Sequence, residues 1–335
     1  MSYYQGKTRV RVYGDINKFK TLKERRSEID RIISSLEEIE PGWQGELAKT
    51  VWARLEEKKQ FLRLKTWQTY LSKCRKFELF LKTSGLLQAD INDFTEAHAR
   101  QFLSKQKNPT TYNHYLQMFR GIWEGFAKEG KVTGNLWSNI QPQRQNPVPA
   151  LFFQERQVKH LHKEIEARDG QLWLFCLFIF YTFIRPGELR LLKVGDIHFE
   201  ENRVLIRSSI SKNKKQQYVA IPEAFQKYLR KSEVYTYPPG YYVFSPGCVP
   251  APDPVGKNWM KIRHQRILRE LGYDTKQYKL YSWKHTGAVM AVRAGVPIKI
   301  LQIQLRHHSL DQVEKYLRQM GINEVENYSD RFPDI

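Results

Sequence analysis

The 335-residue sequence predicts two globular units. The first unit is α-helical, and the second is mixed α+β, mostly helical with a small antiparallel sheet. Three observations support this prediction. Apolar residues recur at helical spacing through the first half, two short alternating segments stand close together in the second half, and a proline-rich stretch, residues 141–150, separates the halves. Hydrophobic residues make up 41% of the chain, which is enough for two cores.

Residues 1–45 are expected to form an N-terminal extension. Residues 9–13 alternate as a short strand does, and apolar residues between 20 and 40 recur on one side of a helix. This segment could be a separate arm that contacts a ligand, or an extra helix packed on the next unit.

Residues 46–140 are expected to form the helical unit, because two stripes of apolar residues recur at helical spacing. The stripes consist of Trp67, Tyr70, Leu71, Cys74, Phe77 and Leu81, and of Tyr112, Tyr115, Leu116, Phe119, Ile122, Trp123 and Phe126. We expect these side chains in the core. Four basic residues fall largely outside the first stripe and are candidate phosphate contacts: Lys65, Lys73, Arg75 and Lys76.

Residues 151–320 are expected to form the second unit, followed by a tail at 321–335. Segments 203–207 and 217–221 predict an antiparallel strand pair joined by a lysine-rich loop. Helices are predicted at 155–167, 171–193, 255–271, 284–294, 297–304 and 310–320. Ser309 and Gln312 form a capping-box pattern at the start of the last helix, and Gly321 ends it.

The net charge of +20 indicates a polyanionic partner. Both larger segments are basic, which favours a clamp around a polyanion over two basic domains that are merely well solvated. The longest apolar run has ten residues, 172–181, whereas a membrane span needs about 20. The three cysteines are widely spaced and lack a CxxC pattern, so a disulfide scaffold or a cysteine zinc site is excluded and a reducing cytosol is favoured.

The sequence lacks the usual motifs of nucleotide and metal sites. It has no GxxxxGK[ST], no GxGxxG and no HExxH, and no tight group of carboxylates that would hold two magnesium ions. We therefore expect no cofactor and no catalytic metal.

Cationic and imidazole groups are instead spread along the second unit. Arg185 follows the most apolar stretch and needs an anion, either Glu188 or a phosphate of a ligand. Lys212 lies in the predicted hairpin with Lys214 and Lys215 behind it, where it could donate a proton or simply solubilise a turn.

Two further groups end the series. Lys284 and His285 open one predicted helix, and His307 precedes another that carries Tyr316. Tyr316 shares a helical face with Val313 and Leu317, so it could equally be a core aromatic.

The order of these groups resembles the tyrosine recombinase (phage-type integrase) family over residues 46–320. The hairpin lysine of that family falls on Lys212, its L-G-H box on residues 305–307, and its nucleophile, nine residues beyond the histidine, on Tyr316. Its first box reads T-G-x-R-x-x-E-L-x-x-L-x-x-x-D, with Phe183 at the usual glycine, and is matched by Thr182, Arg185, Glu188, Leu189, Leu192 and Asp196.

The second box departs from the family pattern H-x-x-R-H-T. Tyr281 replaces the first histidine, and Lys284 replaces the arginine. Lysine keeps the positive charge but loses the planar two-pronged grip on phosphate. Two alternatives to a recombinase therefore stay open: a catalytically impaired DNA-binding relative, and a type IB-like topoisomerase.

The resemblance implies a core-binding (SAM-like) DNA-binding domain at 46–140, a linker at 141–150 and a catalytic domain of tyrosine recombinase type at 151–320. It implies that Tyr316 forms a covalent 3′-phosphotyrosine without a metal. Arg185, Lys284 and His307 would stabilise the phosphate charge, with His285 assisting and Lys212 as general acid. Nearby cations are expected to favour the phenolate of Tyr316.

The resemblance also implies the setting of the reaction. The partner is double-stranded DNA, bound by a homotetramer in the synaptic complex and by a monomer when free, with possible accessory DNA-bending proteins. Residues 1–45 would be an arm-type DNA-binding segment, and the tail would pack on a neighbouring protomer. A site-specific recombinase of a phage or other mobile element would act in the cytoplasm, on the nucleoid.

Overall fold

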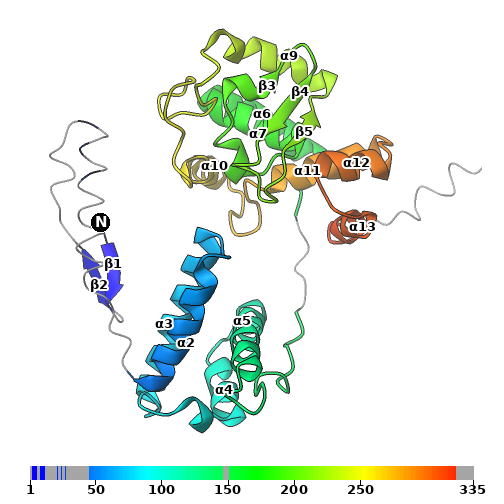
Figure 1. Cartoon of the computed structure of the whole chain (residues 1–335). Coiled ribbons are helices and arrows are strands. Elements are labelled where there is room, and N and C mark those ends of the chain that lie inside the picture. Colours follow the sequence, from blue (N-terminus) through cyan, green and yellow to red (C-terminus); the bar gives the residue numbers. More distant parts are fainter. Residues whose placement is uncertain are drawn as a thin grey trace, which may run out of the picture. The chain divides into compact units, whose positions relative to one another are not determined.

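The computed structural model describes residues 2–5, 8–11, 21, 24, 27, 45–145 and 151–321 of the chain (Figure 1). The chain forms two compact units, Met1–Asn146 and Pro147–Ile335. No helix in these described ranges is long and apolar enough to cross a membrane. The helix expected within 20–40 and the tail beyond Gly321 lie outside the described residues, apart from three isolated positions.

The first unit begins with two paired strands, β1 (Ser2–Gln5) and β2 (Thr8–Arg11), which are antiparallel. The strand expected at 9–13 starts one residue earlier, at Thr8, and its last two residues lie outside the described residues. The helices of this unit are α2 (Glu46–Lys59), α3 (Leu64–Thr83), the short 3-10 helix η2 (Ile91–Asp93), α4 (Glu96–Ser104) and α5 (Pro109–Lys128).

Aromatic rings fill the core of the first unit. Phe77 of α3 lies edge-on to Phe102 of α4 at 5.2 Å, and Phe119 of α5 stacks on Trp137 at 4.9 Å. The whole predicted stripe of α5 is buried, as the helical spacing predicts. Asn108 caps α5 by accepting a hydrogen bond from the Thr111 backbone N–H at 3.1 Å.

The second unit is mostly helical with a small sheet. Its elements are α6 (Glu155–Arg168), α7 (Gly170–Thr182), α8 (Pro186–Leu189), η3 (Val194–Asp196), β3 (Ile197–His198), β4 (Arg203–Ile206), β5 (Gln217–Ala220), α9 (Glu223–Lys231), η4 (Val234–Thr236), α10 (Trp259–Glu270), α11 (Ser282–Arg293), α12 (Ile298–Leu305) and α13 (Leu310–Arg318). The predicted mixture of helices with a small antiparallel sheet is confirmed.

The sheet has the strand order β3-β4-β5, and Val204 of β4 lies opposite Val219 of β5. The predicted β4–β5 pair is present, whereas the two-residue strand β3 was too short to predict. The outer edge of β5 is covered by α12 (Figure 1). There the Gln304 side chain accepts from the Ala220 N–H at 3.0 Å and donates to the Ala220 carbonyl at 2.8 Å. This amide occupies the open backbone groups of an edge strand.

Helix α7 is buried on nearly all sides and lies in the core of the unit. The single helical segment predicted at 171–193 is wrong, because α7 stops at Thr182. Phe183 then takes a left-handed conformation (φ 55°), and Pro186 starts the short helix α8. A left-handed residue at the end and proline at the first position of the next helix separate the two.

Helix α11 packs closely on α7. A Cβ added at Gly287 would lie 2.0 Å from the Phe180 carbonyl oxygen, so only glycine allows this approach of the two backbones. The contact places the first turn of α11, which carries the second-box residues, beside the end of α7.

The last two helices position the expected nucleophile. Helix α12 ends at Leu305, and the next residue, Arg306, is left-handed (φ 57°). Ser309 caps α13 by accepting from the Gln312 backbone N–H at 3.3 Å. The predicted capping box is only half formed, because the Gln312 side chain accepts from the His308 N–H at 3.0 Å instead of closing on Ser309. Gly321 (φ 74°) follows the last turn of α13, as predicted.

Candidate active site

A buried carboxylate, Glu188, joins three segments of the second unit. It is 3% exposed and lies 3.3 Å from the Arg185 guanidinium through its Oε1. The backbone N–H of Lys212 donates to the same oxygen at 3.0 Å, and Arg306 forms an ion pair with Oε2. Burial would raise the pKa of Glu188, but the hydrogen bond and charge of Arg306, with the other two groups, lower it overall. Glu188 is therefore an anion, and it is held by Arg185 of the first box, by the backbone of the hairpin at Lys212 and by Arg306 after α12.

Lys284 is the most buried cation of the predicted set. Its side chain is 1% exposed, and its ammonium donates to the Phe183 carbonyl at 3.0 Å. Burial lowers the pKa of Lys284 to about 7, and the positive charges of Arg185 and Arg306 add to this effect. The left-handed turn at Phe183 thus supplies the acceptor for an amine that is only partly charged at neutral pH.

Tyr316 lies against both predicted histidines. Its hydroxyl is 2.9 Å from His285 Nδ1, and its ring meets the His307 ring edge-on at 5.5 Å. Burial lowers the pKa of each histidine to about 4, and Lys284 contributes in both cases. Both rings are therefore neutral at pH 7, and Nδ1 of His285 accepts the phenol hydrogen in the tautomer that leaves this nitrogen free.

The expectation that cations favour the phenolate of Tyr316 is wrong for the protein without DNA. Burial raises the pKa of Tyr316 above its ordinary value, and the phenol of Tyr281 raises it further. Tyr316 is partly buried, so the loss of water around the phenolate disfavours the anion.

The hairpin lysines are exposed. Lys212 is fixed through its backbone to Glu188, while its side chain extends into solvent, and Lys214 and Lys215 follow on the same exposed turn. The structure therefore brings five predicted residues together through side-chain contacts or charge effects, and the sixth, Lys212, through its backbone: Arg185, Lys284, His285, His307, Tyr316 and Lys212.

Arg306 belongs to this site and was not predicted. It is 5% exposed, and Nε and Nη1 of its guanidinium are buried without a hydrogen-bond partner among the described residues. The only signal in the sequence was an arginine at the glycine of the L-G-H pattern. That signal indicates a change at this position but not the direction in which the side chain points.

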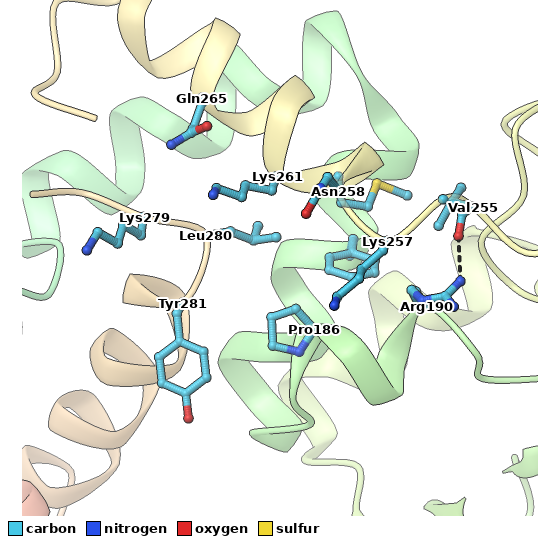
Figure 2. Close-up of a pocket in the computed structure, with 13 residues that line it drawn as sticks. Pro186, Arg190, Val255, Lys257, Asn258, Lys261, Gln265, Lys279, Leu280 and Tyr281 are labelled. Carbon is cyan, nitrogen blue, oxygen red and sulfur yellow. Dashed lines mark hydrogen bonds between the residues drawn. The ribbon is translucent and has the colours of Figure 1, made fainter. Parts of the chain in front are cut away.

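A basic pocket of about 250 Å³ adjoins the site at Pro186 and Tyr281. Figure 2 shows Lys257, Lys261 and Lys279 among the residues that line it, with the Tyr281 hydroxyl pointing away from them. All three lysines are exposed. The lysines of this pocket therefore form a positively charged surface next to the residues of the first and second boxes.

The basic face of α3 divides into two kinds of residue. Lys65, Arg75 and Lys76 are exposed. Lys73 is half-buried, donates to the His114 carbonyl at 2.9 Å and lies over the Tyr115 ring at 5.3 Å. Burial lowers its pKa. Lys73 therefore ties α3 to α5, whereas the other three side chains are free to reach a ligand.

Comparisons with known proteins agree with this arrangement. Residues 152–320 match the sequence model of the phage integrase family. A tyrosine recombinase from Thermosipho africanus (strain TCF52B) is 23% identical over 262 residues, which cover 75% of this chain and 88% of that protein.

Solved structures share the fold at low sequence identity. The Tn1549 transposon integrase in complex with a circular intermediate DNA has a TM-score of 0.69 at 12% identity, with 86% of this chain and 100% of that chain covered. A lambda integrase tetramer bound to a Holliday junction has a TM-score of 0.65 at 16% identity, with 87% and 90% covered. The predicted tyrosine recombinase type of fold is thereby confirmed.

Proposed function

This chain belongs to the phage integrase family of tyrosine recombinases, and on that premise we propose that it cuts and rejoins DNA strands through a covalent 3′-phosphotyrosine at Tyr316. Members of this family are DNA strand-transfer enzymes. The observation that carries the proposal is the Tyr316 hydroxyl, which lies 2.9 Å from a neutral His285 and beside His307. A core aromatic would not need two imidazoles at its polar end.

The cleavage step transfers a DNA phosphoryl group from the 5′ oxygen to the oxygen of Tyr316. The Tyr316 oxygen attacks the phosphorus, and the bond from phosphorus to the 5′ oxygen breaks. The phenol hydrogen passes to His285 Nδ1, and Lys212 gives a proton to the departing 5′ oxygen. The phosphotyrosine ester retains the free energy of the phosphodiester bond that was broken. A 5′ hydroxyl can therefore reverse the step without a nucleotide cofactor.

Fixed positive groups stabilise the charge on the nonbridging oxygens in this proposal, and no metal ion takes part. Arg185 and Lys284 supply the positive charge, and His307 donates a hydrogen bond to the phosphate. In the free protein the pKa of Lys284 is only about 7 and that of His307 about 4. A DNA phosphate placed among these groups favours their protonated forms, so DNA binding increases the positive charge of the active site.

Double-stranded DNA is the proposed partner, and its backbone contacts lie on two surfaces. One is the basic pocket with Lys257, Lys261 and Lys279, together with Lys214 and Lys215 of the hairpin. The other is the exposed face of α3, formed by Lys65, Arg75 and Lys76. Together they would form the clamp that the net charge of +20 predicts.

Joining a new partner strand requires two duplexes and several protomers. The lambda integrase structure with this fold is a tetramer on a Holliday junction. We propose the same tetramer for this chain in its synaptic complex, with a monomer when free and with DNA-bending proteins as possible accessory factors. The natural substrate would be the ends of a phage or other mobile element, recombined in the cytoplasm.

A covalent adduct tests the proposal directly. Nicked duplexes that tile the DNA on both sides of the protein's own gene are incubated with the full chain, and adducts are isolated under denaturing conditions. Mass spectrometry should place the nucleotide on Tyr316. Tyr316→Phe should abolish the adduct, whereas Tyr235→Phe, which changes an exposed tyrosine of the same unit, should not.

The outcomes separate the alternatives. Exchange of strands between two differently labelled duplexes supports a recombinase, whereas adducts that only relax supercoils support a type IB-like topoisomerase. DNA binding with no adduct on any duplex identifies an impaired relative and refutes the proposed chemistry.

A further inference from the structure

The second box leaves the site short of one guanidinium. Lys284 stands where the family pattern has arginine, and it offers a single ammonium on a flexible stem. That ammonium already donates to the Phe183 carbonyl at 3.0 Å and is 1% exposed. Lysine at this position therefore cannot supply the two parallel N–H donors that an arginine gives to a phosphate.

Arg306 supplies a guanidinium from another direction. It occupies the glycine position of the L-G-H pattern, keeps a left-handed backbone (φ 57°) and directly precedes His307. Its side chain is 1% exposed, and one nitrogen is paired with Glu188. The remaining Nε and Nη1 are buried without a partner within the described ranges. Unmet donors of a buried guanidinium are costly, so their retention points to a ligand.

Glu188 places this guanidinium beside the first-box arginine. Arg185 approaches Oε1 of the carboxylate, and Arg306 approaches Oε2. Both arginines act electrostatically on Lys284 and on Tyr281, which shows that all four groups share one neighbourhood. Two guanidiniums on one carboxylate leave one positive charge uncompensated, which suits a phosphodiester anion.

We propose that Arg306 donates hydrogen bonds to a nonbridging oxygen of the scissile phosphate and so replaces the arginine missing from the second box. The inference rests on the proposed function and adds a residue to it. A relocated guanidinium also explains why a large charged side chain occupies a left-handed position that glycine adopts without strain.

The competing possibility is that Arg306 only supports Glu188. Arg306→Lys keeps the positive charge near the carboxylate but removes the planar fork, and Arg306→Gln removes the charge. We expect single-turnover adduct formation to slow by about 100-fold or more in both, in line with removal of one transition-state donor. Arg318→Gln, which changes an exposed arginine on α13, is the matched control and should react at the wild-type rate.

A neutral substrate separates contact with the phosphate from support of the fold. A methylphosphonate at the cleavage position removes the negative charge of one nonbridging oxygen. If Arg306 bonds that oxygen, Arg306→Gln should slow this substrate at least tenfold less than it slows the ordinary diester. An equal effect on both substrates would assign Arg306 a supporting role and overturn the proposal.

A double variant adds a test of replacement. Lys284→Arg combined with Arg306→Gly restores the family pattern at both positions and should react at least tenfold faster than Arg306→Gly alone. If the wild type forms the adduct and the Arg306 variants form it at the same rate, this inference is refuted and the proposed function stands. Absence of wild-type adduct would instead refute the proposed function.

Discussion

Replacing the buried amine of Lys284 by an apolar chain should change how the stability of the second unit depends on pH. The pKa of Lys284 falls from its ordinary 10.5 to about 7 in the folded protein. At about 1.36 kcal/mol per pKa unit, burying this group costs on the order of 5 kcal/mol of unfolding free energy below pH 7. The unfolded chain binds more protons between pH 7 and 10.5, so this cost decreases as the pH rises.

The expected signal is a difference between two proteins. Lys284→Met cannot titrate, so wild type should gain about 2 kcal/mol relative to the variant between pH 7 and pH 9. Removal of the hydrogen bond to Phe183 adds a constant that does not depend on pH. The buried histidines of the site titrate below this range, because the pKa of His285 and of His307 is about 4 when folded.

The measurement must report on the second unit. Full-length protein is equilibrated in urea at each pH, labelled by a brief hydrogen-exchange pulse, and read by mass spectrometry on peptides from α7. Lys261→Met controls for the removal of one exposed positive charge. A wild-type-minus-variant difference that stays constant within about 0.5 kcal/mol from pH 7 to 9 would refute the reasoning, because Lys284 would then keep its ordinary pKa.

Two further predictions concern the proton donor and the DNA surface. Lys212→Ala should slow adduct formation by about 100-fold or more, and a substrate with sulfur in place of the departing 5′ oxygen should restore most of the rate, since a thiolate leaves without a proton; equal slowing of both substrates would exclude Lys212 as the acid. Changing Lys65, Arg75 and Lys76 together to alanine should lower DNA affinity and reduce the slope of log K against log salt by about 0.9 for each DNA phosphate that these side chains neutralise, as measured by titration at several salt concentrations. An unchanged slope would remove this face of α3 from the interface.

Local patterns predicted those parts of the fold in which spacing and burial agree. The stripe of α5 is buried along its length, and the alternating segments around Val204 and Val219 pair as expected. The end of α7 was missed because apolar residues resume at Phe183 and Ile184 after the single polar Thr182, so the apolar spacing alone does not mark it. The left-handed turn at Phe183 lies where α7 packs closely on α11, a contact that no short window of sequence contains.

The site was predictable where a residue type implies its own chemistry and was missed where orientation decides. The boxes identified Arg185, His307 and Tyr316, which the structure brings into one neighbourhood. Arg306 was missed because only the fold turns the end of α12 toward Glu188. The direction of the Tyr316 pKa was wrong because positive groups can be counted in a sequence, whereas the removal of water from around the phenol cannot.

The way Glu188 holds the hairpin has a consequence for redesign. It binds that loop through the main-chain N–H at position 212 and not through a side chain. A grafted loop of different composition should therefore seat correctly whenever its backbone offers one N–H at that register. Inserting or deleting a single residue ahead of it would misplace the lysine even if every original amino acid were kept.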